Sequence, residues 1–482
     1  ERVRFLSTRR CRHFLASIAP RLLESINATG DPDATLVNLV NVSDSLGGKG
    51  VLWELFSANR ATLELYVRLC GASNYLAGIL TSNPGMIDEL LDSLLLDRLP
   101  SREALEATLA DLARGADDLL PIVRSFKNSQ HLRVGVRDIL SKDGIEQTHA
   151  ALSDIAEVIL QQVAHSEYAK LEEKFGRPML ESASPEHRPC ELIILAMGKM
   201  GGREPNYHSD MDLVFLYEAD GSTQPIRPSQ KSRATTNQHF FSELGQRIIS
   251  AMNQAGPQGR LYDVDPRLRP TGRSGTLAIS LADFAKYFAQ GHGRLWERQA
   301  LCKARPIFGS PEVRDQVAET VRQAITNPPW HSRDATDIRR MRSQLEQSAA
   351  ATNLKRGPGG TVDIEFVVQM LQLKHAAGDP SVMQPGTLAA LESLRAGGNL
   401  SEDHCDFFDR AYRFLRSVES HLRLMNTTAR HDLPQETAES NKLAWLLDFS
   451  GGQSLIDETK QITGETRQRF QEVFEIAEAG TS

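Results

Sequence analysis

The sequence lacks the features that mark disulfide-rich, zinc-binding and membrane-spanning proteins. Its five cysteines stand singly, without the close spacing of a zinc site or of a disulfide framework, at Cys11, Cys70, Cys190, Cys302 and Cys405. No apolar run approaches the roughly 20 residues of a membrane helix, and the charged first residues do not resemble a signal peptide. These absences favour a protein of the reducing cytoplasm that does not bind membranes.

A strong positive charge and an initiating methionine are also absent. The chain has 55 Lys and Arg residues against 62 Asp and Glu residues, which gives a net charge of −7. No overall basic field therefore attracts nucleic acid, although a local basic cluster can still hold a phosphate. The first residue is Glu1, and we expect a piece of a longer protein or a processed product.

Apolar periodicity divides the chain into three parts, namely a helical region at 1–185, a mixed core at 186–325 and a helical bundle at 326–482. Apolar residues recur at helical spacing over 12–26 and over 147–176 in the first part. Amphipathic helical patterns return after the core. The chain therefore has a helical domain, a compact α/β insert and a helical bundle.

Four segments within the core are typical of strands. Short continuous apolar runs occur at 190–197, 211–217 and 276–280, and polar and apolar residues alternate at 260–270. A helical pattern separates the second strand from the third. We predict an α+β fold that is predominantly helical, with a small mixed sheet between an N-terminal helical domain and a C-terminal helical bundle.

Asp210 and Asp212 stand at the start of the strand predicted at 211–217. Residues i and i+2 of a strand project from the same face, so both carboxylates point together. Such a pair is costly unless a cation lies between the two groups, and Mg²⁺ prefers oxygen ligands. The segment Gly-Lys-Met-Gly-Gly precedes the pair, and its glycines let backbone N–H groups approach an anion. The alternative is a turn-capping Asp210 beside a solvated Asp212.

The segment at 260–270 offers a third carboxylate. In a strand, Asp263 and Asp265 share one face, and Arg267 and Arg269 continue it, where both guanidinium groups can hold phosphate oxygens. A solvated charged face is the alternative. Together with the first pair, Asp265 completes a set of three carboxylates for a two-metal centre.

These motifs resemble those of a known family. The sequence segments that carry the resemblance are GKMGGREPNYHSDMDLVFLY, LYDVDPRLRPTGRSGTL, LWERQALCKARP and GPGGTVDIEFVVQMLQL. Their combination is similar to the glutamine synthetase adenylyltransferase family, whose core resembles the nucleotidyltransferase fold of DNA polymerase beta. The resemblance extends over essentially the whole chain.

The resemblance implies roles for particular residues. It implies that Asp210, Asp212 and Asp265 are catalytic and bind metal, with Asp265 as the general base. It implies that Gly201, Gly202 and Ser209 cradle phosphate. Asp263 stands where a glutamate is common, and His208 replaces a small residue and is expected to fill space.

The resemblance also implies a reaction and partners. The family is duplicated, and this chain is more similar to the C-terminal, adenylylating half, which transfers AMP from ATP to a tyrosine hydroxyl of glutamine synthetase with two Mg²⁺ ions. The expected partners are glutamine synthetase, a PII-type signalling protein and the N-terminal adenylyl-removing half of the same polypeptide. The alternatives are the phosphorolytic AMP-removing half and a catalytically silent regulatory module.

Two further basic motifs have open roles. Lys355 and Arg356 precede a Pro-Gly-Gly turn that opens a helix, where they contact either a triphosphate or a partner, or simply form a loop. Lys303 and Arg305 belong to a segment of mixed charge that favours a salt-bridged helical face, with contact to the nucleotide as the alternative. Cys302 is expected to be a small buried hydrophobe.

Overall fold

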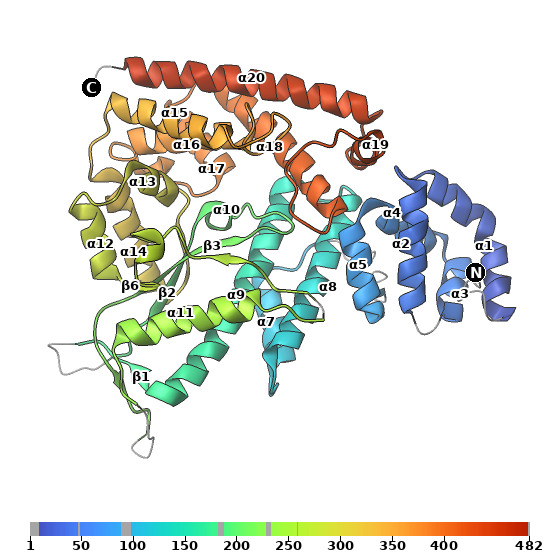
Figure 1. Cartoon of the computed structure of the whole chain (residues 1–482), viewed down its shortest axis with the longest axis horizontal. Coiled ribbons are helices and arrows are strands. Elements are labelled where there is room, and N and C mark those ends of the chain that lie inside the picture. Colours follow the sequence, from blue (N-terminus) through green and yellow to red (C-terminus); the bar gives the residue numbers. More distant parts are fainter. Residues whose placement is uncertain are drawn as a thin grey trace.

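A small mixed sheet lies at the centre of a molecule built mostly from helices (Figure 1). The computed structural model describes residues 9–46, 49–87, 98–181, 188–227, 233–257 and 259–480. The prediction of a predominantly helical α+β fold is confirmed. None of the helices formed by the described residues combines the length and apolar character needed to cross a bilayer.

The central sheet has five strands, with β5, β3, β2 and β7 in spatial order and β6 beside the other end of β3. Strands β2 and β7 run antiparallel to their neighbours, whereas β5 and β6 are parallel to β3. The strands are β2 (Leu192–Ala196), β3 (Met211–Tyr217), β5 (Val264–Asp265), β6 (Ala278–Ser280) and β7 (Arg305–Phe308). A separate two-stranded sheet pairs β1 (Arg177–Pro178) with β4 (Thr223–Gln224).

The middle of the sheet is the core of the molecule. All five residues of β2 are buried, and Asp212 is the one residue of β3 that is not fully buried. Such continuous apolar strands form where both faces of a sheet are covered. Helix α11 (Asn237–Asn253) packs on β3 and β6, where Phe241 stacks on Tyr217 with ring centroids 5.4 Å apart. Asp212 is thus the one partly exposed, charged residue in an otherwise apolar strand.

The N-terminal helices extend to one side of the sheet, as the blue and cyan ribbons of Figure 1 show. The last of them, α9, is predicted from the sequence to end near Gly176, and Gly176 does terminate it in a left-handed conformation with φ of 87°. These helices are α1 (Arg9–Asn27), α2 (Pro32–Ser45), α3 (Lys49–Ala58), α4 (Arg60–Ala72), α5 (Asn74–Ser82), α7 (Arg102–Ala113), α8 (Leu119–Ile139) and α9 (Ile145–Phe175).

The C-terminal helices lie on the opposite side of the sheet from α11 (Figure 1). Helix α20 packs along α15, α16, α18 and α19, and α18 also contacts α5 and α9 of the N-terminal region. The helices after β7 are α14 (Pro311–Thr326), α15 (Ser332–Glu346), α16 (Thr361–His375), α17 (Thr387–Ala396), α18 (Glu402–Met425), α19 (Thr437–Leu446) and α20 (Gly452–Ala479).

Two predictions about the core strands are wrong in detail. The strand predicted over 260–270 is only two residues long, because Pro266 cannot donate to the ladder and a turn begins at Arg267. The segment predicted as a helical face at 295–306 forms helix α13 (Leu295–Leu301) and then enters the edge strand β7. Between β6 and α13 lies the short helix α12 (Leu281–Ala289).

Candidate active site

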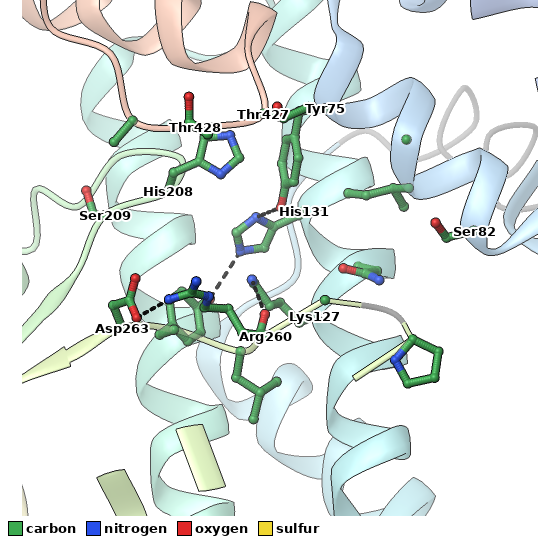
Figure 2. Close-up of a pocket in the computed structure, with 18 residues that line it drawn as sticks. Tyr75, Ser82, Lys127, His131, His208, Ser209, Arg260, Asp263, Thr427 and Thr428 are labelled. Carbon is green, nitrogen blue, oxygen red and sulfur yellow. Dashed lines mark hydrogen bonds and ion pairs between the residues drawn. The ribbon is translucent and has the colours of Figure 1, made fainter. Parts of the chain in front are cut away.

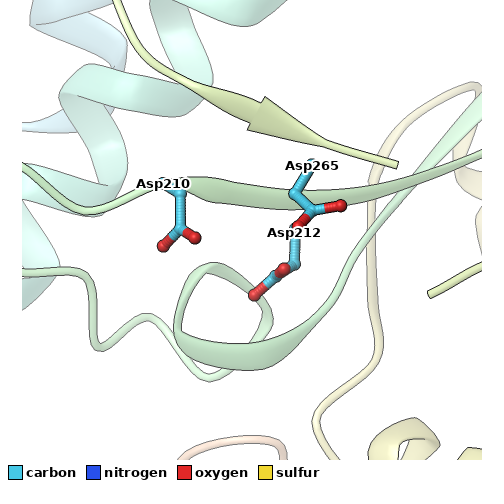
Figure 3. Close-up of side chains that lie close together, drawn as sticks. All are labelled: Asp210, Asp212 and Asp265. Atoms are coloured by element: carbon cyan, nitrogen blue, oxygen red, sulfur yellow. The ribbon is translucent and has the colours of Figure 1, made fainter. Parts of the chain in front are cut away.

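Asp210, Asp212 and Asp265 converge at one end of the parallel pair of strands β3 and β5 (Figure 3). Asp212 and Asp265 are register partners, and Asp210 immediately precedes β3. One carboxylate oxygen from each residue lies within 4.8 Å of the other two. The structure therefore brings together the three carboxylates that the sequence singles out, and we call them the carboxylate cluster.

The carboxylate cluster is electrostatically strained without a cation. Burial, followed by the charges of Asp210 and Asp265, raises the pKa of Asp212 to about 6. The neighbouring Asp265 differs, because its hydrogen bonds from the Arg267 guanidinium lower its pKa. Nε of Arg267 donates to both oxygens of Asp265 at 2.8 Å, so Arg267 partly balances the cluster.

Gly198 makes room beside Asp212. It begins the single helical turn α10 (Gly198–Gly201) with a positive φ of 53°, which favours glycine. A Cβ atom on residue 198 would lie 2.4 Å from Oδ2 of Asp212. The N–H of Met197 donates to the backbone carbonyl of Asp212 at 2.9 Å, which fixes the turn against β3. Any other residue at position 198 would fill the space next to this carboxylate.

Gly201 and Gly202 are required for packing at the other end of the same turn. A Cβ on Gly201 would lie 1.8 Å from the carbonyl oxygen of Lys303, and one on Gly202 would lie 3.0 Å from that of Pro385. Arg305 fixes this end of the turn, because its guanidinium donates to the carbonyls of Gly201 at 3.0 Å and Met200 at 3.1 Å. Phosphate binding by the two glycines stays a prediction.

Ser209 is held from two sides just before Asp210. Its Oγ accepts the N–H of Asn206 at 2.9 Å and a hydrogen bond from Nη1 of Arg423 at 3.2 Å. Arg423 belongs to α18, and the same nitrogen also donates to the carbonyl of Tyr207 at 3.0 Å. The C-terminal bundle thus fixes the segment that leads into the first carboxylate.

The two arginines predicted to hold phosphate differ in their surroundings. Arg267 has an exposed side chain next to the carboxylate cluster. Arg269 is buried and turns inward, where it donates to the carbonyl of Pro266 at 2.7 Å and holds the turn after β5. Arg269 therefore shapes this turn, whereas Arg267 can reach an anion at the cluster.

Asp263 lies outside the carboxylate cluster. The sequence pattern places it on one strand face with Asp265, but β5 begins only at Val264. The side chain of Asp263 instead forms an exposed ion pair with Arg260, and its carbonyl accepts the N–H of Met211 at 2.8 Å.

Lys355 approaches the carboxylate cluster from the C-terminal bundle. Its positive charge lowers the pKa of Asp212 and so opposes part of the repulsion within the cluster. It stands in the turn before α16 that the sequence motif predicts, and is half-buried, whereas the neighbouring Arg356 is exposed. Lys355 is thus the member of this motif that faces the candidate site.

A buried group of charges joins the α10 turn to the C-terminal helices, and we call it the Glu204 cluster. It consists of Lys199, Glu204, Lys303, Glu365 and Tyr412. Nζ of Lys303 donates to Oε2 of Glu204 at 2.7 Å, and the hydroxyl of Tyr412 donates to the same oxygen at 2.9 Å. Lys199 forms an ion pair with Glu365 of α16. Lys303 thus has a structural partner well inside the protein.

The pKa values within the Glu204 cluster follow from its burial and its ion pairs. Burial lowers the pKa of Lys199 to about 8, although Glu365 opposes this effect. Burial alone would raise the pKa of Glu204, but the ammonium groups of Lys303 and Lys199 hold it well below its usual range. The cluster is therefore charged and paired, which is the condition for keeping such groups inside a protein.

Sequence reasoning missed the residues that support the carboxylate cluster. Gly198 belongs to the glycine-rich turn that the sequence singles out before the acidic pair, but its contact with Asp212 is seen only in the structure. Arg423 and Glu365 had none, because their partners Ser209 and Lys199 are far away along the chain. Cys302 is buried, as expected from the sequence.

The carboxylate cluster suits a hard divalent cation. All three side chains offer oxygen, and Mg²⁺ prefers oxygen ligands and retains water and phosphate in its shell. The raised pKa of Asp212 and the convergence of three carboxylates are the observations that fit such an ion. Exposed Arg267 and half-buried Lys355 add positive charge beside the cluster, where an anionic substrate would lie.

The sequence matches two family models. Residues 63–320 match the model described as glutamate-ammonia ligase adenylyltransferase, and residues 332–478 match the model described as GlnD PII-uridylyltransferase. The first match covers more than half of the chain and includes the carboxylate cluster, the α10 turn and the sheet.

Curated relatives have similar sequences along most of the chain. Three are named bifunctional glutamine synthetase adenylyltransferase/adenylyl-removing enzyme. The protein of Thioalkalivibrio sulfidiphilus is 33% identical over 90% of this chain and 46% of its own length. The protein of Rhodopseudomonas palustris is 32% identical over 92% of this chain and 44% of its own length. The protein of Streptomyces coelicolor is 31% identical over 93% of this chain and 42% of its own length. The chain thus spans about half the length of these relatives.

Proposed function

Because the chain belongs to the glutamate-ammonia ligase adenylyltransferase family, we propose that it transfers AMP from ATP to a tyrosine hydroxyl of glutamine synthetase and releases pyrophosphate. The carboxylate cluster is the observation that carries this proposal. Three carboxylates on two parallel strands, beside a glycine turn and exposed basic side chains, suit a metal–triphosphate substrate. The same arrangement favours a core of the DNA polymerase beta type.

Asp210, Asp212 and Asp265 would hold Mg²⁺, which when bound neutralises triphosphate charge and lowers the pKa of the attacking hydroxyl. The tyrosine oxygen forms a bond to the α-phosphorus, and the bond between that phosphorus and pyrophosphate breaks. Asp265 accepts the hydroxyl proton. Arg267 must first release Asp265, and its exposed side chain leaves it free to turn toward the departing pyrophosphate.

Other residues of the chain orient the substrate rather than react with it. Gly198 lets the α10 turn approach the carboxylate of Asp212 closely, and the positive charge of Lys355 acts on the same carboxylate. Ser209, which Arg423 holds in place, would contact a phosphate oxygen. We propose that Gly201 and Gly202 keep the α10 turn close to the triphosphate through their packing.

The direction of transfer is the second part of the proposal. The relatives are named for both adenylylation and adenylyl removal, and the chain spans about half of their length. The motif at 359–366, GGTVDIEF, is more similar to the adenylylating half of the family. We therefore favour AMP attachment, with glutamine synthetase and a PII-type signalling protein as partners in the cytoplasm.

A two-armed transfer assay tests the proposal. In the first arm, the chain is incubated with Mg²⁺, ATP labelled at the α-phosphorus and unmodified glutamine synthetase. In the second arm, it is incubated with inorganic phosphate and labelled adenylylated glutamine synthetase. We expect label on the protein in the first arm and little release of ADP in the second. Release of ADP with no labelling would show that the chain removes AMP rather than attaching it. Inactivity in both arms would contradict the proposal that the chain is an AMP-transferring enzyme.

A further inference from the structure

A cavity of about 540 Å³ lies beside the carboxylate cluster, where the N-terminal helices, the core and the C-terminal bundle meet (Figure 2). Its walls come from α5, α8, the segment before β5, the residues His208 and Ser209, and the segment after α18. The volume lies within the range of about 300–1,000 Å³ that small-molecule sites occupy. We call it the α5–α8 cavity.

Lys127 of α8 lines the α5–α8 cavity without a carboxylate partner. Its Nζ donates to the carbonyl of Arg260 at 3.2 Å and lies 4.7 Å from the ring centroid of Tyr262. Among the described residues, no carboxylate forms an ion pair with it. The nearby Asp263 is already paired with Arg260. Within the described part of the chain, the ammonium group is therefore a positive charge in the cavity wall without an ion-pair partner.

The pKa of Lys127 reflects this environment. Burial lowers it to about 8, and the positive charge of Arg260 acts in the same direction. A bound anion would offset the free-energy cost of burying the ammonium charge, because an opposite charge within about 4–6 Å favours the charged form of a lysine. The geometry of the wall and this electrostatic cost thus point to the same class of ligand.

Two tyrosines and a histidine form a hydrogen-bonded chain in the same wall (Figure 2). Nδ1 of His131 lies 2.9 Å from the hydroxyl of Tyr75, and Nε2 lies 3.1 Å from that of Tyr262. Burial lowers the pKa of His131 well below its usual value, so the ring is neutral and has one donor and one acceptor nitrogen. One tyrosine therefore donates to the ring, while the other accepts from it and keeps its own proton.

That remaining hydroxyl proton belongs to Tyr75 or to Tyr262, and both residues line the α5–α8 cavity. Thr427 and Thr428 line the wall on the side of the C-terminal bundle and add hydroxyl groups. An ammonium group together with several hydroxyl donors is the arrangement that recognises phosphate or carboxylate oxygens.

We propose that the α5–α8 cavity binds a small anion through a phosphate or carboxylate group held by Lys127. This site is separate from the metal–triphosphate site, and the inference does not depend on the direction of AMP transfer. His208 and Ser209 line the cavity and lead directly into Asp210. An anion bound here therefore contacts the segment that positions the first carboxylate of the cluster.

Thermal unfolding of the whole chain tests the proposal. The melting temperature is measured in EDTA, with inorganic phosphate, succinate or chloride at matched ionic strength, so that no metal contributes. We expect phosphate or succinate to raise it by about 2 °C or more over chloride, because a ligand that binds only the folded state stabilises that state. A shift with phosphate alone assigns a phosphate-bearing ligand, and a shift with succinate alone assigns a carboxylate.

Three variants locate the bound anion. Lys127→Met keeps most of the side-chain volume and should abolish the shift, whereas Lys127→Arg should retain it. Lys355→Met removes the lysine beside the carboxylate cluster and should also retain the shift. Circular dichroism confirms that each variant is folded. The proposal is overturned if neither anion stabilises the native chain beyond chloride, or if Lys355→Met abolishes the shift while Lys127→Met retains it.

Discussion

Asp212 on β3 and Asp265 on β5 lie directly opposite each other in a parallel strand pair. Like charges that face each other across two strands destabilise a sheet. Here they share one side of a pair that is only two residues long, and Asp210 adds a third charge. Repulsion between these carboxylates therefore destabilises the folded protein at the position where a cation would be bound.

Replacement of Asp212 by asparagine should abolish AMP transfer. The change removes a negative charge from the centre of the carboxylate cluster but little volume, so the fold should persist. Loss of about 3 kcal/mol of transition-state stabilisation lowers the rate on the order of 100-fold, and we expect at least this effect in the labelled-ATP assay.

Asp220→Asn is the matched control for that variant. Asp220 stands just beyond the other end of β3, where it is exposed and accepts a hydrogen bond from Tyr217 at 3.0 Å. Transfer by this control should remain near the native rate. A normal rate for Asp212→Asn in the presence of Mg²⁺ would show that Asp212 is not a metal ligand.

The same Asp212→Asn change should stabilise the metal-free protein, and the gain should depend on pH. The pKa of Asp212 is about 6 in the folded state against an ordinary value of 3.8. The folded state thus keeps a proton that the unfolded state loses, and native stability falls as pH rises through about 4 to 6. At pH 7.5 we expect a gain on the order of 1–2 kcal/mol, after a discount for partial exposure.

Denaturant unfolding in EDTA at pH 7.5 and pH 4.5 measures this effect. The difference between native and variant protein should shrink at pH 4.5, because the Asp212 carboxyl is then largely protonated in the folded state and carries no charge in the carboxylate cluster. Addition of Mg²⁺ at pH 7.5 should stabilise the native protein more than the variant. An equal difference at both pH values would contradict the raised pKa.

Gly201→Ala should strongly destabilise the protein, because the new Cβ would lie 1.8 Å from the backbone oxygen of Lys303. Backbone atoms cannot yield as a flexible side chain can, so we expect a loss of at least about 3 kcal/mol. Gly464→Ala in the exposed part of α20 is the control, since no atom lies within 4 Å of its Cβ position. This change should stabilise the helix by about 0.5–1 kcal/mol, and melting temperatures compare the two variants.

Arg423→Met should reduce both stability and transfer. It removes the hydrogen bonds to Ser209 and Tyr207 and a buried ion pair with Glu419 at 3.4 Å, at an expected cost of about 3 kcal/mol. Because Ser209 leads into Asp210, the rate of AMP transfer per folded molecule should also fall by about tenfold.

The control for Arg423 is another arginine with a glutamate partner. Arg430 pairs with Glu439 at 2.7 Å, but its side chain is 51% exposed. Arg430→Met should cost less than about 1 kcal/mol and leave transfer unchanged. Equal losses for the two variants in urea unfolding would show that burial does not set the contribution of Arg423.

The sequence predicts well those features that depend on neighbouring residues. The alternation around Asp210 and Asp212, the apolar run of β3 and the glycine stop of α9 are all local signals. The convergence of Asp265 on the same site follows from its place at a second strand. The structure shows Asp265 close to Asp210 and Asp212, whereas the role of Asp265 as a general base stays a prediction.

Features that depend on contacts between distant segments were not predicted. Strand β7 is short and contains Pro306, so it has too few residues to show the alternation of polar and apolar side chains that is typical of a strand. The charged residues before it follow helical spacing, and the sequence therefore predicts a helix there. The position of Arg269 depends on a turn that follows β5, and that of Lys303 depends on Glu204. No local pattern distinguishes a buried, paired lysine from one that is free to meet a nucleotide.

The Glu204 cluster also bears on how this chain can be divided. Its members come from the core at Lys199, Glu204 and Lys303, and from the C-terminal helices at Glu365 and Tyr412. A fragment that ended before α16 would lose Glu365, the ion-pair partner of Lys199, and Tyr412, which donates a hydrogen bond to Glu204. The core and the bundle should therefore melt cooperatively and resist separation by a protease.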